Sequence, residues 1–243
     1  MISFLGLCVQ NLIKSIKYML SGRVRFTSVV SQAAAISYDS LPISLIIAFI
    51  ASAVIAIQVS KEFLISGAES YVGGTMTLII IREVAPSFVA LAISARAGTA
   101  ISAEIANMKV TSQVDAIKTL KVEPVGYYFA PRLLSAAVTV PMVVLVAELL
   151  AIIGGMFICF FTINLHPNRY ITSVWLWLKT RDIYVSIFKA FCFGVTVALV
   201  CATQGYSTDG GAKEVGTATT QAAIKSTIYM IIVDFIIDII FYV

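Results

Sequence analysis

Charged residues are scarce in this chain of 243 residues. Only 12% of them are Asp, Glu, Lys or Arg, while 59% are hydrophobic and the mean hydropathy is +0.95. Soluble domains carry about 25% charged residues, roughly twice this share. The shortage excludes an ordinary water-soluble domain. The net charge is only +4 and the basic residues are scattered along the chain, which also excludes a nucleic-acid-binding surface.

Motifs for metal binding and catalysis are missing as well. The four cysteines lie far apart, form no C-x-x-C pair and have no neighbouring histidine; the only histidine is His166. The chain contains no G-x-x-x-x-G-K-[ST] motif for ATP, no G-x-S-x-G elbow and no H-E-x-x-H zinc helix. We therefore expect no catalytic residue, no metal site and no cofactor bound by this chain itself.

Long apolar runs dominate what is present. About 20 helical residues, at 1.5 Å each, cross the hydrocarbon core of a membrane. Asp39 and Ser40 fit a helix N-cap, and Pro42 fits a first helical turn. A Gly- and Thr-rich loop is predicted over 204–220. The pattern predicts an all-α integral membrane protein with five transmembrane helices, at 41–59, 72–95, 133–162, 183–203 and 224–243.

The first 25 residues predict an interfacial amphipathic helix. Its basic residues follow the apolar ones, which is not the order of a secretory signal. Arg23 and Arg25 then add positive charge before the first span. A helix of this kind lies in the plane of the membrane. Its apolar stripe consists of Ile2, Leu5, Val9, Leu12, Ile13, Ile16 and Leu20.

The polar segment 96–131 separates the second and third predicted spans. Val110, Val114, Ile117 and Leu120 recur at helical spacing and predict one apolar face. Ser112 and Asp115 fit a capping box, and Pro124 ends any such helix. A short amphipathic helix in this position can lie on the bilayer, pack on its own protein, or present a face to a soluble partner.

The distribution of basic residues predicts the orientation. Cytoplasmic connections carry an excess of Lys and Arg. Eleven of these residues lie in the N-terminal segment, the polar segment extended to Arg132, and the fourth connection with Lys213 and Lys225, against four in the other connections. The N-terminus, the polar segment and the Gly-rich loop are therefore predicted to face the cytoplasm or stroma, where ATP is found.

Charges within the predicted spans are candidates for function, because each costs about 2.5 kcal/mol or more at the membrane centre. One hypothesis is that Arg82 pairs with a carboxylate and stabilises the bundle. The other is that several of these groups line a cavity for a lipid headgroup, or form a proton relay. The carboxylates concerned are Glu83, Glu148, Asp234 and Asp238.

Small residues recur every fourth position at Ala90, Ser94, Gly98 and Ser102. Small faces let helices approach closely in lipid. The stripe can serve packing within the subunit or the contact between two copies of the chain.

Four segments together resemble the MlaE family of ABC-transporter permeases, which move phospholipids and other lipids between membranes. The resemblance covers the chain from about residue 28 onward. Departures from the family pattern are Ala95 and Asn107, where Gly is usual, Ser112 for Glu, and Gln221 for a basic residue. The segments are IREVAP at 81–86, ARAG at 95–98, AEIANMKVTSQVDA at 103–116 and GTATT at 216–220, with VEP at 122–124 and APR at 130–132 in support.

The resemblance implies a single permease domain over 1–243 that forms a homodimer. It implies two copies of a separate P-loop ATPase, which binds ATP and Mg, and an MCE-type lipid-binding partner on the far side. The segment 96–131 then becomes the coupling region that docks on the ATPase. The implied ATPase contacts are Glu104, Thr111, Gln113 and Asp115, and the implied lipid-pathway residues are Arg82, Glu83 and Asp234.

Two alternatives remain at the level of sequence: a proton-coupled secondary transporter and a structural membrane subunit without transport activity. No inverted repeat supports the former. The segment IQVSKEF at 57–63 resembles the cyanobacterial and plastid branch of the family. We therefore predict a chloroplast membrane, in particular the inner envelope, with the inner membrane of a cyanobacterium as the alternative.

Overall fold

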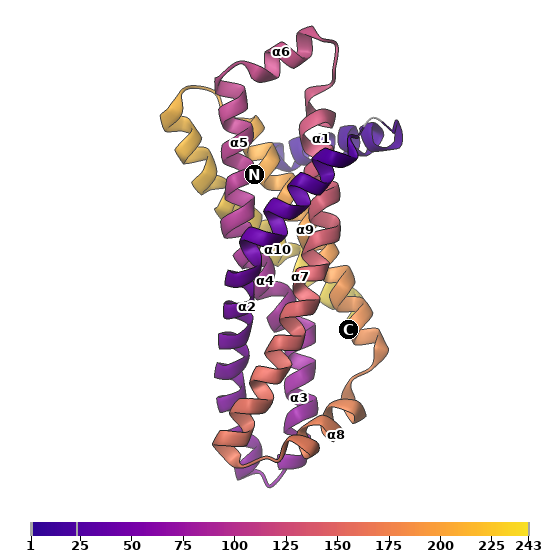
Figure 1. Ribbon diagram of the computed structural model, residues 1–243, viewed down its shortest axis with the longest axis vertical. Helices are drawn as coiled ribbons and strands as arrows, with labels where there is room; N and C mark the ends of the chain where they lie inside the picture. The colour runs from indigo at the N-terminus through magenta and orange to yellow at the C-terminus, as the bar shows by residue number, and fades with distance from the viewer. Residues whose placement is uncertain (1, 23, 243) are drawn as a thin grey trace. The chain divides into compact units, whose positions relative to one another are not determined.

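The computed structural model describes residues 2–22 and 24–242 (Figure 1). Within these ranges nearly all residues are helical and no residue lies in a strand. Helices pair their backbone polar groups internally, as a lipid environment requires. The predicted all-α fold class is therefore confirmed. Arg23, assigned above to the basic N-terminal segment, lies outside the described residues.

Four helical stretches of the described residues are long and apolar enough to cross a membrane. They are α2 (Phe26–Ile65), the stretch Glu69–Val110, α7 (Pro124–Ile163) and α9 (Thr180–Tyr206), and they contain the first four predicted spans. The predicted fifth span lies in α10 (Ala212–Tyr242), which is not among the four. The count of five therefore stays a prediction.

The stretch Glu69–Val110 is a succession of helices of different pitch. Two segments within it are π-helical, and π-bulges occur often at functional sites. The first carries Arg82 and Glu83, and the second carries Arg96. In chain order the segments are η1 (Glu69–Tyr71), α3 (Val72–Ile79), η2 (Ile80–Val84), α4 (Ala85–Ile93), η3 (Ser94–Gly98) and α5 (Thr99–Val110).

Two predicted boundaries are wrong. α2 begins at Phe26, so Asp39 and Ser40 are not N-caps and Pro42 lies inside the helix. Helices in membranes tolerate an internal proline because neighbouring groups satisfy the backbone that it frees. The predicted loop over 204–220 shrinks to 207–211, because α9 continues to Tyr206 and α10 begins at Ala212.

The chain divides into two compact units, each built from separate stretches of sequence. Unit 1 comprises Met1–Ser40, Ile93–Val140 and Phe191–Val243; unit 2 comprises Leu41–Ala92 and Pro141–Ala190. The predicted single domain over 1–243 stays a prediction.

In unit 2, α3 packs closely against α8 (Pro167–Trp177), as Figure 1 shows. His166, predicted to lie in a loop, is the N-cap of α8 and accepts a hydrogen bond from the Asn168 amide at 3.4 Å. Gly74 donates its backbone N–H to Ser173 Oγ at 2.9 Å. A Cβ added at Gly73 would lie 2.4 Å from the Tyr170 carbonyl oxygen, so only glycine allows this approach.

Replacing Gly73 with alanine is therefore expected to force α3 and α8 apart and to lower the free energy of unfolding by about 1–3 kcal/mol. Gly6→Ala is the matched control, because a Cβ added there meets nothing within 4 Å. Equilibrium unfolding in mixed detergent micelles measures the free energy of unfolding of both variants. Equal stability of Gly73→Ala and the native chain would contradict the close approach.

In unit 1, α5 and η3 pack against α10, and three of the four small residues of the stripe lie on η3 and α5. Ser94 Oγ lies 2.6 Å from Ser226 Oγ, and Ser102 Oγ donates to the Ala218 carbonyl at 3.5 Å. A Cβ at Gly98 would lie 2.9 Å from Cys201 Sγ. These three residues of the stripe therefore serve packing within the subunit.

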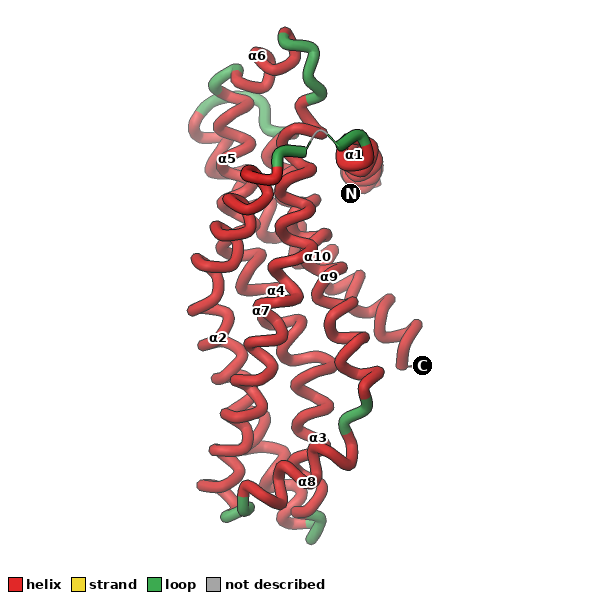
Figure 2. Tube along the Cα trace, turned by 45° about the vertical axis from the view of Figure 1, so that its right-hand side comes forward, coloured by secondary structure: helices red, strands yellow, loops and turns green. Residues whose placement is uncertain are grey.

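The helix α1 (Ile2–Leu20) is seen almost end-on in Figure 2, while α5 of the same unit stands nearly upright. Two of its polar residues are turned toward the protein. Asn11 is buried and donates to Thr203 Oγ1 at 3.2 Å, and Ser15 is fully buried. Six of its exposed side chains are large and apolar, namely Leu5, Leu7, Val9, Ile13, Ile16 and Leu20, and Gln10, Lys14 and Lys17 are exposed as well. This arrangement suits a helix whose outer face meets lipid.

Candidate functional site

The corner between α5 and α6 (Gln113–Thr119) is the first candidate site, in unit 1 (Figure 1). Thr111, Gln113 and Asp115 are all exposed there. Ser112 is the N-cap of α6, as predicted, but it has a left-handed backbone with φ 59° and makes no side-chain capping hydrogen bond. The capping box is therefore wrong, and Asp115 instead accepts from Lys118 at 2.9 Å.

The predicted apolar face of this region is only partly present. The turn at Thr111 separates Val110 from the residues that follow. In α6, Val114 is buried, whereas Leu120 is 74% exposed. The corner thus anchors itself through Val114 and presents polar side chains and Leu120 outward.

Glu104, also predicted to contact the ATPase, lies elsewhere. It sits on α5, about two turns before the corner. Its carboxylate accepts from Arg132 Nη2 at 2.6 Å, and Arg132 Nη1 also donates to the Tyr128 carbonyl at 2.9 Å. Glu104 therefore joins α5 to α7, and it does not share the corner with Thr111, Gln113 and Asp115.

Three segments predicted to face the same side of the membrane contact one another in unit 1. Lys109 Nζ, at the end of α5, lies 2.7 Å from Asp209 Oδ1 in the α9–α10 loop. The hydrogen bond from Lys109 holds the pKa of the Asp209 carboxyl below its usual range. Lys14 of α1 lies 3.5 Å from Glu123, just before α7. Contacts between these segments agree with the prediction that they face the same side of the membrane.

The second candidate site is a network of charges in unit 2. Arg82 donates from Nε to Asp182 Oδ1 at 2.9 Å, and its Nη2 lies 2.8 Å from the same oxygen. Lys189 Nζ donates to Glu83 Oε1 at 2.8 Å and to the Arg82 carbonyl at 2.9 Å. The two acids and two bases therefore balance in charge.

This network includes a partner of Arg82 that the sequence-based hypothesis did not name. Arg82 was expected to pair with Glu83, Glu148, Asp234 or Asp238, and the structure shows it bound to Asp182, 100 residues away. Sequence reasoning missed Asp182 and gave Lys189 no role. A lysine within an apolar span needs a counter-charge, and that signal could have pointed to Glu83.

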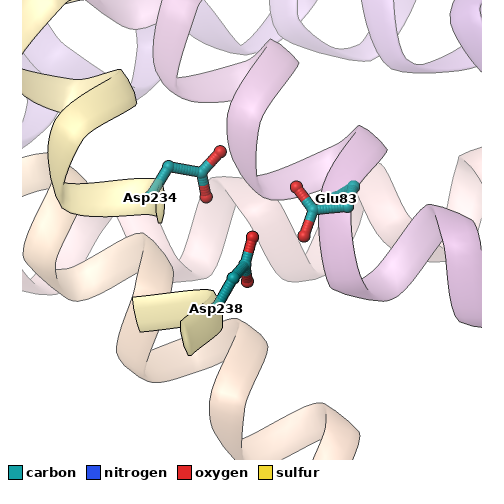
Figure 3. Close-up of side chains that lie close together, drawn as sticks. All are labelled: Glu83, Asp234 and Asp238. Carbon is teal, nitrogen blue, oxygen red and sulfur yellow. The ribbon is translucent and has the colours of Figure 1, made fainter. Parts of the chain in front are cut away.

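Three further carboxylates lie in the predicted spans, namely Glu148, Asp234 and Asp238. Glu148 is buried in unit 2 and accepts a hydrogen bond from Ser186. Asp234 and Asp238 stand one turn apart on α10 in unit 1, and Figure 3 labels them together with Glu83 of η2. The lipid-pathway set Arg82, Glu83 and Asp234 draws on both units and stays a prediction.

Comparison with known proteins adds a second kind of observation. The model of the family described as "Permease MlaE" matches residues 29–240. A "Probable ABC transporter permease protein" of Rickettsia typhi is 35% identical over 202 residues, which cover 83% of this chain and 78% of the relative. Proteins with the same description from Synechocystis sp. and Porphyra purpurea are 32% and 29% identical, over 91% and 83% of this chain and 84% and 77% of the relatives.

Proposed function

Because the chain belongs to the MlaE permease family, we propose that it is the membrane-spanning permease subunit of an ABC transporter. Its relatives are described as probable ABC transporter permeases, which supports this assignment. Its cargo is a phospholipid or another glycerolipid, moved between membranes. A separate ATPase binds ATP and Mg and supplies the work.

The exposed corner carries this proposal. A helix as short as α6 gains little stability from its own turn. At the corner between α5 and α6, the polar side chains of Thr111, Gln113 and Asp115 are exposed, on the side predicted to face ATP. Such a surface suits docking of a soluble partner better than packing on its own chain. In this proposal the ATPase contacts these three side chains, while Glu104 transmits the motion.

Contacts within unit 1 connect the corner to the longer helices. Glu104 and Arg132 join α5 to α7, Ser94 and Ser226 join η3 to α10, and Lys109 reaches the α9–α10 loop. A push on α6 would therefore reach α5, α7 and α10 together. ATP-driven motion shifts the lipid pathway only if the partner binds two states of these helices with different affinity.

The proposed assembly contains two copies of this chain, two ATPase subunits and an MCE-type lipid-binding protein. Arg82, Glu83 and Asp234 contribute to the lipid pathway. The relatives from Synechocystis sp. and Porphyra purpurea support a chloroplast membrane, in particular the inner envelope, with a cyanobacterial inner membrane as the alternative.

Replacing Thr111, Gln113 and Asp115 together with alanine is expected to separate the ATPase from the permease. Loss of three central polar contacts should weaken binding at least about tenfold, equivalent to about 1.4 kcal/mol. Co-purification and lipid-stimulated ATP hydrolysis in nanodiscs measure the loss. The matched control replaces Asn168, Arg169 and Thr172, three exposed polar residues of α8.

The native complex should retain bound glycerolipid. An unchanged ATPase association in the corner variant would contradict the docking site. A native chain that binds no ATPase would favour a proton-coupled transporter acting through Glu83, Asp234 and Asp238. A chain that binds neither ATPase nor lipid would favour a structural subunit.

A further inference from the structure

A cavity of about 210 Å³ lies in unit 1, beside the corner but separate from it. Its walls come from the end of α1, the residues that begin α2, Met108 of α5 and the first turns of α7. The polar and basic side chains that line it are Tyr18, Arg25, Ser28, Gln32, Tyr127, Tyr128 and Arg132. We call it the Tyr–Arg cavity.

Arg132 is the decisive residue of this cavity. Its side chain is 6% exposed, and two of its nitrogens donate to Glu104 and to the Tyr128 carbonyl. Its Nε is buried and has no hydrogen-bond partner among the described residues. A buried charged donor without an acceptor costs free energy, so an acceptor supplied from outside the chain would be favourable.

The charge of the cavity limits what that acceptor can be. Arg25 is exposed at the cavity, whereas Glu104 is already engaged by Arg132. Of the described residues that line the cavity, none is acidic. Guanidinium groups bind phosphate oxygens with paired, charge-assisted hydrogen bonds, and Tyr, Ser and Gln side chains can donate to the remaining oxygens. This chemistry favours a phosphate-bearing anion over a neutral ligand.

The walls are held in place without such a ligand. A Cβ added at Gly126 would lie 2.5 Å from the ring of Tyr18, so the end of α1 packs directly on the backbone of α7. Beside the cavity, Leu20 and Phe26 are strongly exposed apolar residues. Tyrosines with apolar neighbours are typical of the depth at which lipid headgroups lie.

We propose that the Tyr–Arg cavity binds a phosphate group, either that of an anionic phospholipid headgroup or free phosphate, through Arg25 and Arg132. The bound anion would join the α1–α2 connection to α7 and so make this part of unit 1 sensitive to its surroundings. This site is distinct from the proposed ATPase contacts and from Arg82, Glu83 and Asp234.

Calorimetric titration of the full chain in neutral detergent micelles tests the proposal. The probes are dihexanoyl phosphatidylglycerol, dihexanoyl phosphatidylcholine and inorganic phosphate. The variants are Arg25→Gln, at an exposed position, and Arg132→Lys, which keeps the charge but loses the planar donors. Lys213→Gln removes one charge from an exposed residue of the same unit and is the matched control.

We expect phosphatidylglycerol to bind more tightly than phosphatidylcholine and to be displaced by inorganic phosphate. Arg25→Gln and Arg132→Lys should weaken binding about tenfold, because each loses charge-assisted donors, while Lys213→Gln stays within about twofold. Thermal unfolding checks that Arg132→Lys is folded; if it is not, Arg25→Gln decides.

Arginine-dependent binding of inorganic phosphate without binding of phosphatidylglycerol would identify free phosphate as the occupant. The proposal is overturned if neither probe binds, or if both arginine variants bind like the Lys213→Gln control. The titration contains no ATPase, so its result is independent of the proposed transport function.

Discussion

Replacing Arg82 with alanine is expected to deplete the folded protein, beyond any effect on transport. Asp182 has a side chain only 3% exposed, and both Nε and Nη2 of Arg82 neutralise its Oδ1. Removing one member of a buried ion pair costs about 3–5 kcal/mol, because the other charge stays buried. That loss is a large fraction of the 5–15 kcal/mol that stabilises a typical domain.

Thermal unfolding and the yield of monodisperse protein measure this effect. Arg181→Ala removes an exposed arginine next to Asp182 and should leave stability nearly unchanged. The double variant Arg82→Met with Asp182→Leu should recover most of the loss, because apolar residues can replace a buried pair. Normal stability of Arg82→Ala with abolished lipid transport would instead assign Arg82 to the lipid pathway.

Glu83→Met is the second change with a large expected effect. Lys189 has no exposed side-chain surface, and Glu83 supplies the carboxylate at 2.8 Å from its Nζ. Loss of that carboxylate should lower the free energy of unfolding by about 3–5 kcal/mol. Lys189→Met should cost less, because the Glu83 side chain is 46% exposed and can be hydrated.

A double-mutant cycle separates the pair from its surroundings. The combined variant Glu83→Met with Lys189→Met should be more stable than Glu83→Met alone, with a coupling energy of about 0.5–3 kcal/mol. Reversible unfolding in mixed micelles gives all four stabilities. Additive effects, or a harmless Glu83→Met change, would show that the contact contributes no stability.

The ion pairs Arg82–Asp182 and Glu83–Lys189 bear on the role of the π-helical segment η2 in the proposed lipid pathway. The side chains of Arg82 and Glu83 remain 36% and 46% exposed while holding Asp182 and Lys189. The exposed parts of these two side chains can therefore contact lipid while both ion pairs are intact. A role in the lipid pathway is therefore proposed for intact pairs, and it predicts that stability and transport fall together in the variants above.

Sequence reasoning failed where a local signal competed with a longer-range one. Asp39, Ser40 and Pro42 are good signals for a helix start, yet α2 passes through them. Arg96 offers a reason: its Nε donates to the Asp39 carbonyl at 3.0 Å, and its Nη2 lies 3.6 Å from the Asp39 carboxylate. No spacing rule predicts a partner 57 residues away.

Sequence patterns alone predicted the all-α membrane class, four candidate spans, the separate helix α6 and membership of the permease family. These properties follow from hydrophobic run length and contiguous motifs, both local along the chain. The packing of distant helices was needed to show that Arg82 pairs with Asp182, that Glu104 binds Arg132, and that three residues of the small-residue stripe pack on α9 and α10. In low dielectric a charge must find a counter-charge, and which one it finds depends on how distant helices pack.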